Sequence, residues 1–387
     1  MLSEKIKETN WSAIKNAPFP AEGVGNQSYN NYHLVGGMIG YFFGTSKYSS
    51  PWKNKVNLPG KNVEEYIKIK DASLSIYSGR KKIPMELFFE NYFDNKIDLC
   101  GDALEILEAR HDWASFEFGL IQAKFFISQW IPETIVHSKK QDEDQVRDHY
   151  DRGDDFYAAF LGPTMIYTSG IISDATKNET LEEIQENKLK LVCERMKFKK
   201  GERHLDIGCG WGTLVAYASK NYETNSTGIT LGRNQTAFGN NRIKEYGVSQ
   251  EQASIHCMDY RDIPPTPKYN KITCLEMAEH VGVRLFSTFL EQVRDMLEDD
   301  GLFFLQIADL IWGLFMAKYI FPGADASCPL AWVINQLECA GFEVYSVDTI
   351  GVHYSDGIGS ATCYQIIAHK NLNAFDRASL ITDRLLS

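Results

Sequence analysis

The run HLDIGCGWGT, His204 to Thr213, contains the residues with the clearest chemistry in the sequence. Its first four residues read as a buried strand, and Gly208, Gly210 and Gly212 follow before a helix that we expect to open near Thr213. Glycine suits this turn because a Cβ would obstruct both a positive φ and the close approach of a ligand to backbone N–H groups. The run therefore predicts a nucleotide-cofactor loop.

Two classes of cofactor use such a loop, and the glycine spacing separates them. A dinucleotide fingerprint has the spacing GxGxxG, with an acidic residue about 20 positions further on. Here the spacing is GxGxG, and the acid Asp206 precedes the first glycine. This arrangement resembles the first motif of S-adenosylmethionine-dependent methyltransferases, which implies that Asp206 and the glycines hold the methionine part of that cofactor. An ordinary tight strand-to-helix turn is the alternative.

Polar side chains also follow the next two expected strands. The second strand ends STGITLGRNQ, where most such methyltransferases place a carboxylate for the ribose; none stands here, and Thr230 and Gln235 can supply the hydrogen bonds. The third strand ends HCMDYRD, where Asp259 can accept from the adenine amine and Tyr260 can cover the adenine face. Each could singly be a turn residue, but their positions at consecutive strand ends favour a cofactor site.

The fourth expected strand ends CLEMAEHVG, which places Glu276, Glu279 and His280 at the predicted catalytic edge of the sheet. A carboxylate in this position is useful where a cation or a departing proton must be handled. The alternative is that the two glutamates cap the following helix.

A sheet must bring these strand ends together. Strands are expected at residues 203–208, 226–231, 253–259, 271–277, 301–308, 342–349 and 361–369, with helices in four of the intervals. This alternation predicts an α/β fold with a doubly wound, largely parallel, seven-stranded sheet. Residues 350–360 are too few for a helical crossover, so the last two strands should form an antiparallel hairpin. This is the layout of the Rossmann-like methyltransferase fold, with the cofactor at the carboxyl ends of the first strands.

The chain before the sheet has a different character. Residues 1–140 carry many aromatic residues on a mainly helical background, and we expect them to form a membrane-associated region ahead of a methyltransferase domain at 141–387. From Asp112 to Ile131 the apolar residues are too dense for a one-sided stripe, which predicts a helix buried on more than one face. The polar residues 136–146 are expected to be a linker.

Composition excludes several classes of protein. The 387 residues carry a formal net charge of -11, which counts against a general nucleic-acid binder. The eight cysteines form no CxxC pair and no Cys/His cluster, so no metal site is expected. The amino terminus lacks the apolar region of a secretory signal. The apolar run Leu34 to Gly44 is too short to span a bilayer, which needs about 20 apolar residues.

The motifs taken together resemble those of a known family. In chain order they are HYDRGDDFY, GPTMIYTSG, LDIGCGWGT, GITLGRNQ, DYRD and EMAEHVG. They resemble the cyclopropane-fatty-acid synthase superfamily of lipid methyltransferases. RHDWASF and GLFMAKYIFPGADAS are closer still to the fungal sphingolipid 9-methyltransferases, and the likeness covers nearly the whole chain. The resemblance implies methyl transfer from S-adenosylmethionine to carbon 9 of the sphingoid base of glucosylceramide, at an existing 8,9 double bond.

The resemblance also assigns residues. In cyclopropane synthases a Cys, a Glu and a His help to hold bicarbonate, which acts as the base. By motif Glu279 keeps the Glu, while Ser169 and Gln306 stand where the Cys and the His would be. These two differences count against a bicarbonate-based mechanism. They leave Glu279 as the base or its orienter, with Ser169 and Gln306 as polar lining. Tyr167 and Thr168 resemble the cofactor-contacting pair after the GP turn.

The sequence differs from the family pattern in three places, and these differences bear on which function it has. The family has two membrane-spanning segments near Leu34 to Ser46, further residues after Ala308, and a long helical insertion near Ser355 that would close the pocket. The resemblance implies an enzyme of the endoplasmic reticulum or another internal membrane, with its catalytic domain in the cytosol. The alternatives are a cyclopropane synthase or other fatty-acyl methyltransferase, and a non-catalytic protein that binds lipid or cofactor.

Overall fold

The computed structural model describes residues 61–115, 120–130, 138–174, 176–310, 320–321, 324, 328–350 and 361–370. The chain divides into two compact units, Met1–Phe118 and Gly119–Ser387.

The first unit packs short helices around two small pairs of strands. Its elements are η2 (Val63–Glu65), β1 (Ile67–Ile69), η3 (Ala72–Leu74), β2 (Ile83–Pro84), α4 (Met85–Phe93), β3 (Ile97–Leu99), α5 (Ala103–Glu108), α6 (Arg110–Trp113) and β4 (Ala114–Ser115). β1 pairs antiparallel with β3, and β2 pairs in parallel with β4. In the core the rings of Phe88 and Trp113 lie 4.7 Å apart, and the Trp113 indole donates to the carbonyl of Ile106. For residues 61–115, the expected aromatic-rich, mainly helical character is confirmed; residues 1–60 lie outside the described residues.

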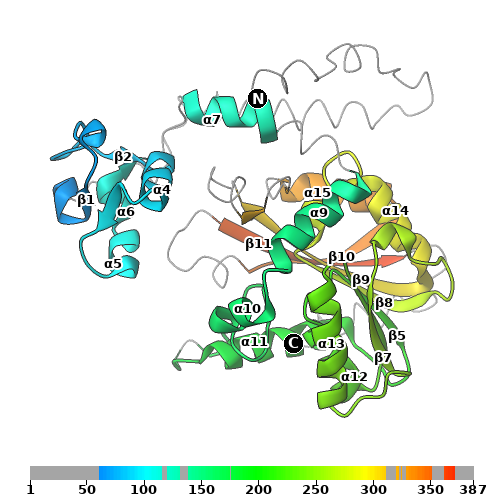
Figure 1. Ribbon diagram of the computed structural model, residues 1–387. Coiled ribbons are helices and arrows are strands. Elements are labelled where there is room, and N and C mark those ends of the chain that lie inside the picture. Colours follow the sequence, from blue (N-terminus) through cyan, green and yellow to red (C-terminus); the bar gives the residue numbers. More distant parts are fainter. Residues whose placement is uncertain are drawn as a thin grey trace, which may run out of the picture. The chain divides into compact units, whose positions relative to one another are not determined.

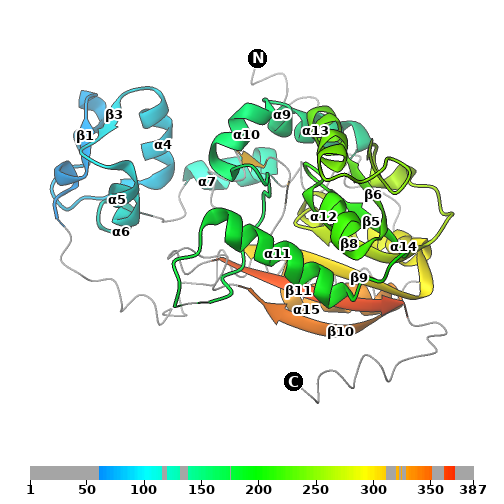
Figure 2. The ribbon, with the colours of Figure 1, turned by 90° about the horizontal axis from the view of Figure 1, so that it is seen from below.

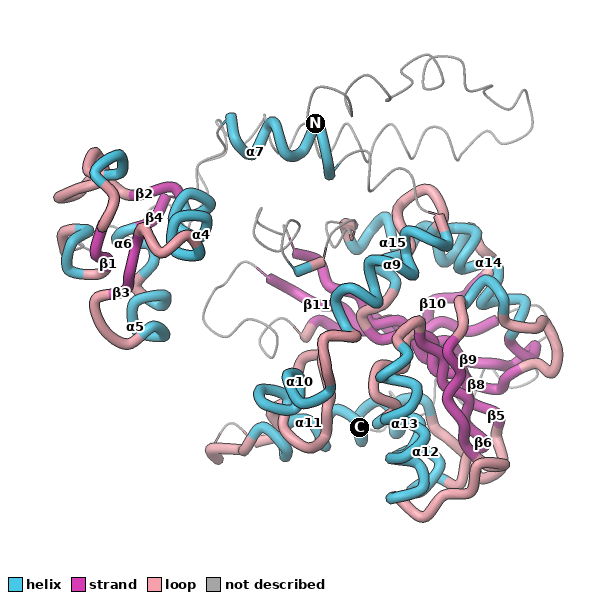
Figure 3. The backbone as a smooth tube through the Cα atoms, viewed as in Figure 1, coloured by secondary structure: helices cyan, strands magenta, loops and turns pink. Residues whose placement is uncertain are grey.

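The second unit is built on a seven-stranded sheet (Figures 1 and 3). Its helices are α7 (Leu120–Phe125), the π-helical turn η4 (Phe126–Trp130), α9 (Lys139–Tyr150), α10 (Asp154–Leu161), α11 (Leu181–Met196), α12 (Thr213–Tyr222), α13 (Arg233–Glu245), η5 (Tyr260–Asp262), η6 (Ala278–His280), α14 (Phe286–Met296) and α15 (Leu330–Cys339). Its strands are β5 (Arg203–Ile207), β6 (Asn225–Thr230), β7 (Ala253–Cys257), β8 (Tyr269–Leu275), β9 (Leu297–Leu310), β10 (Phe342–Thr349) and β11 (Ala361–Lys370).

The strand order is β10-β11-β9-β8-β5-β6-β7. Strands β7, β6, β5, β8 and β9 pair in parallel, and β11 runs antiparallel to both β9 and β10. All seven expected strands are present, and the expected terminal hairpin is confirmed. Because β5, β6 and β8 are parallel neighbours, their carboxyl ends meet at one edge of the sheet.

Helices cover both faces of the sheet, as Figures 1 and 2 show. Strand β9 explains the two layers: Phe303 and Leu305 pack with α14 and α15, whereas Leu302 and Phe304 pack with α11 and α12. This alternation follows from the two-residue period of a strand. Helix α13 lies beside α12 and contacts β6 and β7. The doubly wound arrangement is therefore confirmed.

The single helix expected from Asp112 to Ile131 is wrong. Helix α6 ends at Trp113, and the next two residues form β4, which pairs with β2. Trp113 is fully buried in the core of the first unit. Trp113, Ala114 and Phe125 of this run are buried, but Ile127 is 63% exposed, so the expected burial holds for only part of the run. The density of apolar residues also does not distinguish a helix from a short buried strand. Helical structure resumes at α7 and η4.

The expected linker at 136–146 is also wrong, because α9 occupies most of it. The Ser138 hydroxyl caps this helix by accepting from the N–H of Gln141 at 3.2 Å. Glu143 and Arg147 form an ion pair one turn apart on its surface. Asp142, the residue before Glu143, is buried and forms an ion pair with Arg261. Among the residues that the structure describes, no helix is long and apolar enough to cross a membrane, and Leu34 to Gly44 lies outside them.

Candidate active site

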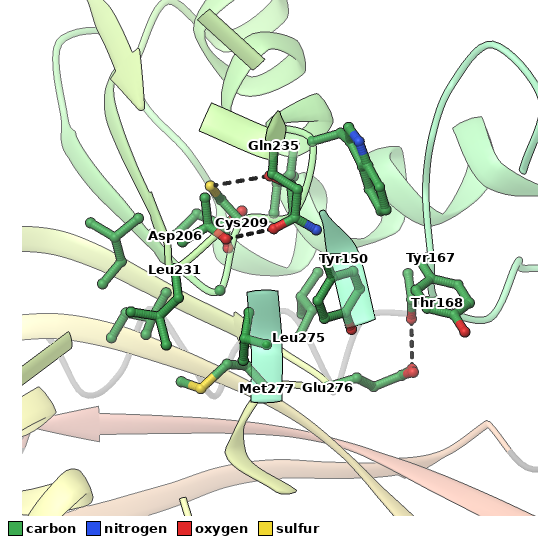
Figure 4. A pocket seen from close by; sticks show the side chains of 18 of the residues that line it. Tyr150, Tyr167, Thr168, Asp206, Cys209, Leu231, Gln235, Leu275, Glu276 and Met277 are labelled. Atoms are coloured by element: carbon green, nitrogen blue, oxygen red, sulfur yellow. Dashed lines mark hydrogen bonds between the residues drawn. The ribbon is translucent and has the colours of Figure 1, made fainter. Parts of the chain in front are cut away.

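A cleft of about 1260 Å³, counted with its open mouth, lies at the carboxyl ends of β5, β6 and β8. Helix α9 contributes Asp142, Val146 and Tyr150 to its wall, and the segment before α11 contributes Tyr167 and Thr168. Figure 4 shows side chains from these elements around the cavity. The predicted strand ends therefore meet, and α9 adds a wall that the sequence did not lead us to expect.

The glycine loop leaves β5 along a left-handed backbone path, with φ of 76° at Gly208, 51° at Gly210 and 74° at Gly212. A Cβ on Gly208 would lie 2.5 Å from Cγ of Met277, whereas one on Gly210 would meet no atom within 4 Å. Gly208 and Gly210 line the cavity. Gly212 does not line it: this residue is the N-cap of α12, where a Cβ would lie 2.1 Å from Cδ1 of Ile255.

Asp206 lies buried where β5 meets the glycine loop. Its Oδ1 accepts a 2.6 Å hydrogen bond from the hydroxyl of Thr273. Burial raises the pKa of Asp206 to about 7, against the lowering effect of that hydrogen bond. Nε2 of the buried His204 lies 2.9 Å from the same hydroxyl oxygen. Since the Thr273 proton goes to Asp206, Nε2 must be the donor in this contact.

Thr230 and Gln235 form a pair at the end of β6. The Thr230 hydroxyl donates to the Gln235 amide oxygen at 2.6 Å and accepts from the N–H of Gly232 at 3.2 Å. Both side chains line the cavity, and Figure 4 includes Gln235. Because its oxygen is engaged by Thr230, the Gln235 amide presents its NH₂ group as the donor for a ligand.

Asp259 and Tyr260 line the cavity from the end of β7 and from η5. Arg261 donates to both carboxylate oxygens of Asp259, at 2.7 Å and 2.5 Å, and also to Asp142 of α9 at 2.7 Å. Burial alone would raise the pKa of Asp259, but the hydrogen bonds from Arg261 lower it. Arg261 therefore keeps Asp259 ionised and ties α9 to the sheet edge.

Glu276 reaches the cavity from the end of β8. Its Oε1 accepts from the Thr168 hydroxyl at 2.6 Å and from Nε2 of Gln306. The Gln306 amide oxygen in turn accepts from Nε2 of Gln365 at 3.0 Å. Figure 4 shows the contact between Thr168 and Glu276 at one end of the cavity.

The three residues expected to do the chemistry stand behind the cavity wall. The Glu279 Oε1 accepts from the N–H of Ala308 at 2.7 Å, and its buried Oε2 has no hydrogen-bond partner among the described residues. Burial first and the charge of Glu276 second raise the pKa of Glu279 to about 8. Ser169 accepts a hydrogen bond from Lys188 at 3.3 Å. None of Glu279, Ser169 and Gln306 is among the lining residues.

The cavity brings together nine of the residues assigned to the cofactor: Tyr167, Thr168, Asp206, Gly208, Gly210, Thr230, Gln235, Asp259 and Tyr260. Glu276 and His280, expected at the catalytic edge of the sheet, also line it.

Sequence reasoning missed Lys188 and Tyr150 as lining residues. Lys188 is 1% exposed and lies on the buried face of α11, one turn before Val192. A lysine on the apolar face of a helix was a usable signal, because buried lysines are rare. Glu276 was recognised at the sheet edge, but its motif also contains Glu279, and spacing alone did not decide which glutamate faces the cavity.

Solved structures share the fold of the second unit. The cyclopropane synthase MmaA2 from Mycobacterium tuberculosis is 23% identical, with a TM-score of 0.54 over 59% of this chain and 98% of that protein. The mycolic acid cyclopropane synthase CmaA1, in complex with SAH and CTAB, is 22% identical, with a TM-score of 0.52 over 59% and 98% of the two chains. At this identity the likeness concerns the fold alone.

Sequence comparisons are more specific. The family model described as mycolic acid cyclopropane synthetase matches residues 137–362. The sphingolipid C9-methyltransferase of Komagataella phaffii is 49% identical over 97% of this chain and 95% of its own. Sphingolipid C9-methyltransferase 2 of Gibberella zeae is 49% identical over 96% and 87%. The first alignment extends over 463 positions, more than the 387 residues of this chain, so that relative has internal residues that this chain lacks. The chain belongs to the sphingolipid C9-methyltransferases, within the mycolic acid cyclopropane synthetase family.

Proposed function

We propose that this protein transfers a methyl group from S-adenosylmethionine to carbon 9 of the 8,9-unsaturated sphingoid base of ceramide or glucosylceramide, giving a 9-methyl branched sphingolipid. The observation that carries the proposal is the single cleft that gathers nine expected site residues at the carboxyl edge of the sheet. The names of relatives up to 49% identical support the substrate class.

The lining residues fit an adenosyl cofactor with a cationic methionine end. The space beside Gly210, where a Cβ would meet no atom within 4 Å, leaves the loop backbone open to a ligand. Asp206 would hold the methionine ammonium with Gly208 and Gly210, while Thr230 and Gln235 would hold the ribose. Asp259 and Tyr260 would hold the adenine, and Tyr167 and Thr168 would complete the site. When bound, S-adenosylmethionine supplies the methyl group as an electrophile.

The chain's own residues must position the alkene, exclude water and accept a proton. An alkene is a weak nucleophile, so close positioning and stabilisation of a carbocation carry much of the work. The raised pKa of Glu279 keeps its carboxyl group largely protonated near neutral pH, which makes it a poor proton acceptor. We therefore assign Glu279 as the group that orients the base. Ser169 and Gln306 provide polar support behind the wall.

We also propose that the enzyme acts at a membrane surface, that of the endoplasmic reticulum or another internal membrane, with the catalytic domain at about 141–387 on the cytosolic side. Exposed aromatic side chains beside the cavity support this. Phe156 and Phe160 on α10 are 53% and 48% exposed. The ring of Phe160 lies 6.0 Å from that of Tyr167, which lines the cavity. Aromatic side chains beside a site for an acyl lipid suit contact with the bilayer interface.

Labelled methyl transfer tests the function directly. Purified protein is incubated with methyl-labelled S-adenosylmethionine and vesicles that contain glucosylceramide with or without the 8,9 double bond. We expect label in the unsaturated lipid only, with the mass gain of one methylene and a branched alkene in the product. A cyclopropane product would favour the synthase alternative, and the absence of any methylated lipid would contradict the proposal.

A further inference from the structure

Glu276 has an unusual backbone for a glutamate. Its φ is 55°, in the left-handed region that is unfavourable for residues with a Cβ. Lys197 and Glu223 share this conformation, but they end α11 and α12, where it is common. Glu276 instead follows β8, and its N–H donates to the carbonyl of Gln306 at 2.9 Å. The fold thus retains an unfavourable conformation at the position that brings a carboxylate to the cavity.

The groups around the Glu276 carboxylate are donors. Thr168 and Gln306 both donate to Oε1, and the Cys363 thiol lies 3.8 Å from the same oxygen. Gln365 engages the oxygen of the Gln306 amide, which turns the Gln306 NH₂ group toward Glu276. Oε1 of Glu276 is therefore the acceptor in both of these hydrogen bonds.

Two buried ionisable groups, Lys188 and Glu279, lie near Glu276. Lys188 is buried and lines the cavity; burial lowers its pKa, and the nearby Glu276 charge opposes that change. Burial and the charge of Glu276 raise the pKa of Glu279 to about 8. Glu279 is therefore largely protonated near neutral pH. Glu276 is the one that faces the cavity.

We propose that Glu276 is the general base of the reaction and stands in place of bound bicarbonate. The inference rests on the proposed function. Methylation of carbon 9 leaves a cation at carbon 8. The C9–H bond then breaks, its electron pair restores the C8=C9 double bond, and the proton passes to a carboxylate oxygen of Glu276. The cation and the carboxylate become a neutral alkene and a neutral acid, which later loses its proton to solvent.

The polar groups near the base are already engaged. Gln306 gives its NH₂ group to Glu276 and Thr168, and Ser169 accepts from Lys188. These are the two residues that differ from the cyclopropane synthase pattern. Gln306 thus donates to the Glu276 carboxylate and to Thr168, and Ser169 accepts from Lys188, which lies beside Glu276 in the cavity wall.

Two variants of the full chain test the inference. Glu276→Gln keeps the shape of the side chain but cannot take a proton, and Glu276→Gly removes the carboxylate while suiting the left-handed backbone. Both should lose about 100-fold or more in turnover, the usual range for a lost general base. Binding of S-adenosylhomocysteine, measured by calorimetry, should stay within about threefold of the wild type. Added formate should restore turnover to Glu276→Gly and not to Glu276→Gln.

The matched control is Glu223→Gly, which alters a left-handed glutamate whose side chain is 58% exposed outside the site. It should keep wild-type turnover. A second readout does not need turnover: a ceramide analogue with a protonated amine at carbon 8 mimics the cation, and it should bind more than about tenfold weaker to Glu276→Gln than to the wild type.

The possible outcomes separate the inference from the function. An active wild type together with active Glu276 variants would overturn the base assignment and leave the function standing. Inactive variants that formate does not rescue, with unchanged binding of the amine analogue, would reduce Glu276 to a positioning residue. A wild type that methylates no sphingolipid would remove both proposals.

Discussion

Among single residues, Asp206 should make cofactor binding depend on pH. Burial raises its pKa to about 7, and the methionine ammonium needs the ionised carboxylate. The affinity for S-adenosylhomocysteine should therefore rise roughly tenfold between about pH 6 and about pH 7.5. Calorimetric titration across this range measures the effect, and Asp206→Asn should bind weakly with no such dependence. A wild-type affinity that does not change with pH would contradict the placement of the ammonium at Asp206.

Glu279→Gln should lower turnover less than Glu276→Gln does. Its pKa of about 8 means that the native state keeps a proton that the unfolded chain releases above its ordinary value of 4.5. Through this group the unfolding free energy falls as the pH rises from about 4.5 to about 8. Glu279→Gln imitates the protonated form, so it should keep more than roughly a tenth of the turnover at neutral pH.

Denaturant unfolding at about pH 6 and about pH 8.5 checks the second half of this prediction. The Gln variant should lose less stability than the wild type when the pH is raised. If Glu279→Gln and Glu276→Gln prove equally inactive while both fold and bind cofactor, the division of roles between the two glutamates is wrong.

The sequence could predict site residues whose position follows directly from a strand end. Asp206, Thr230 and Asp259 come from neighbouring parallel strands, so their meeting needs no knowledge of side-chain direction. Glu276 differs because its left-handed backbone decides where the side chain points. Lys188 differs because it enters the site through the packing of α11, which is distant in sequence from the strand ends.

At the scale of elements, α9 should depend on the link between Asp142 and Arg261. Arg261 lies between the carboxylates of Asp142 and Asp259 and is 17% exposed. Arg261→Met leaves two close carboxylates without their cation, which should destabilise the docking of α9 by about 2 kcal/mol, less than for a fully buried pair. Hydrogen exchange of the α9 amides should speed up, and cofactor affinity should fall because α9 forms a wall of the cavity.

Lys139→Ala is the control for this prediction, because Lys139 joins the same helix to Asp262 through an exposed ion pair. Its effect on exchange and on cofactor binding should be small. Unaltered exchange in Arg261→Met would show that apolar contacts alone hold α9 against the cavity.

Some of the predicted strands and helices are present in the structure and others are not, and each outcome has a physical reason. The seven strands were predictable because apolar runs of strand length alternate with helical segments. The run from Asp112 was not, since Trp113 belongs to one compact unit and α7 to the other. Helix α9 was missed because its stability comes from a Ser138 cap, an ion pair and one buried acid, none of which gives an apolar stripe.

At the scale of the whole molecule, cofactor binding should be a property of the second compact unit. Every lining residue of the cleft lies between Asp142 and Val281, inside Gly119–Ser387. This unit also has its own hydrophobic core on both faces of the sheet, and the first unit has a separate core around Trp113. A fragment of residues 119–387 should therefore fold and bind S-adenosylhomocysteine within about threefold of the full chain.

Methylation of vesicle-bound lipid by the same fragment tests what the first unit adds. If the aromatic-rich first unit holds the enzyme at the membrane, as proposed, the fragment should lose turnover on lipid in vesicles. It should keep turnover on short-chain ceramide in detergent, because the cleft lies within the fragment. Circular dichroism and cooperative thermal unfolding first establish that the fragment is folded. A folded fragment that binds no cofactor would show that the first unit is needed to complete the site, and full turnover on vesicles would contradict its role at the membrane.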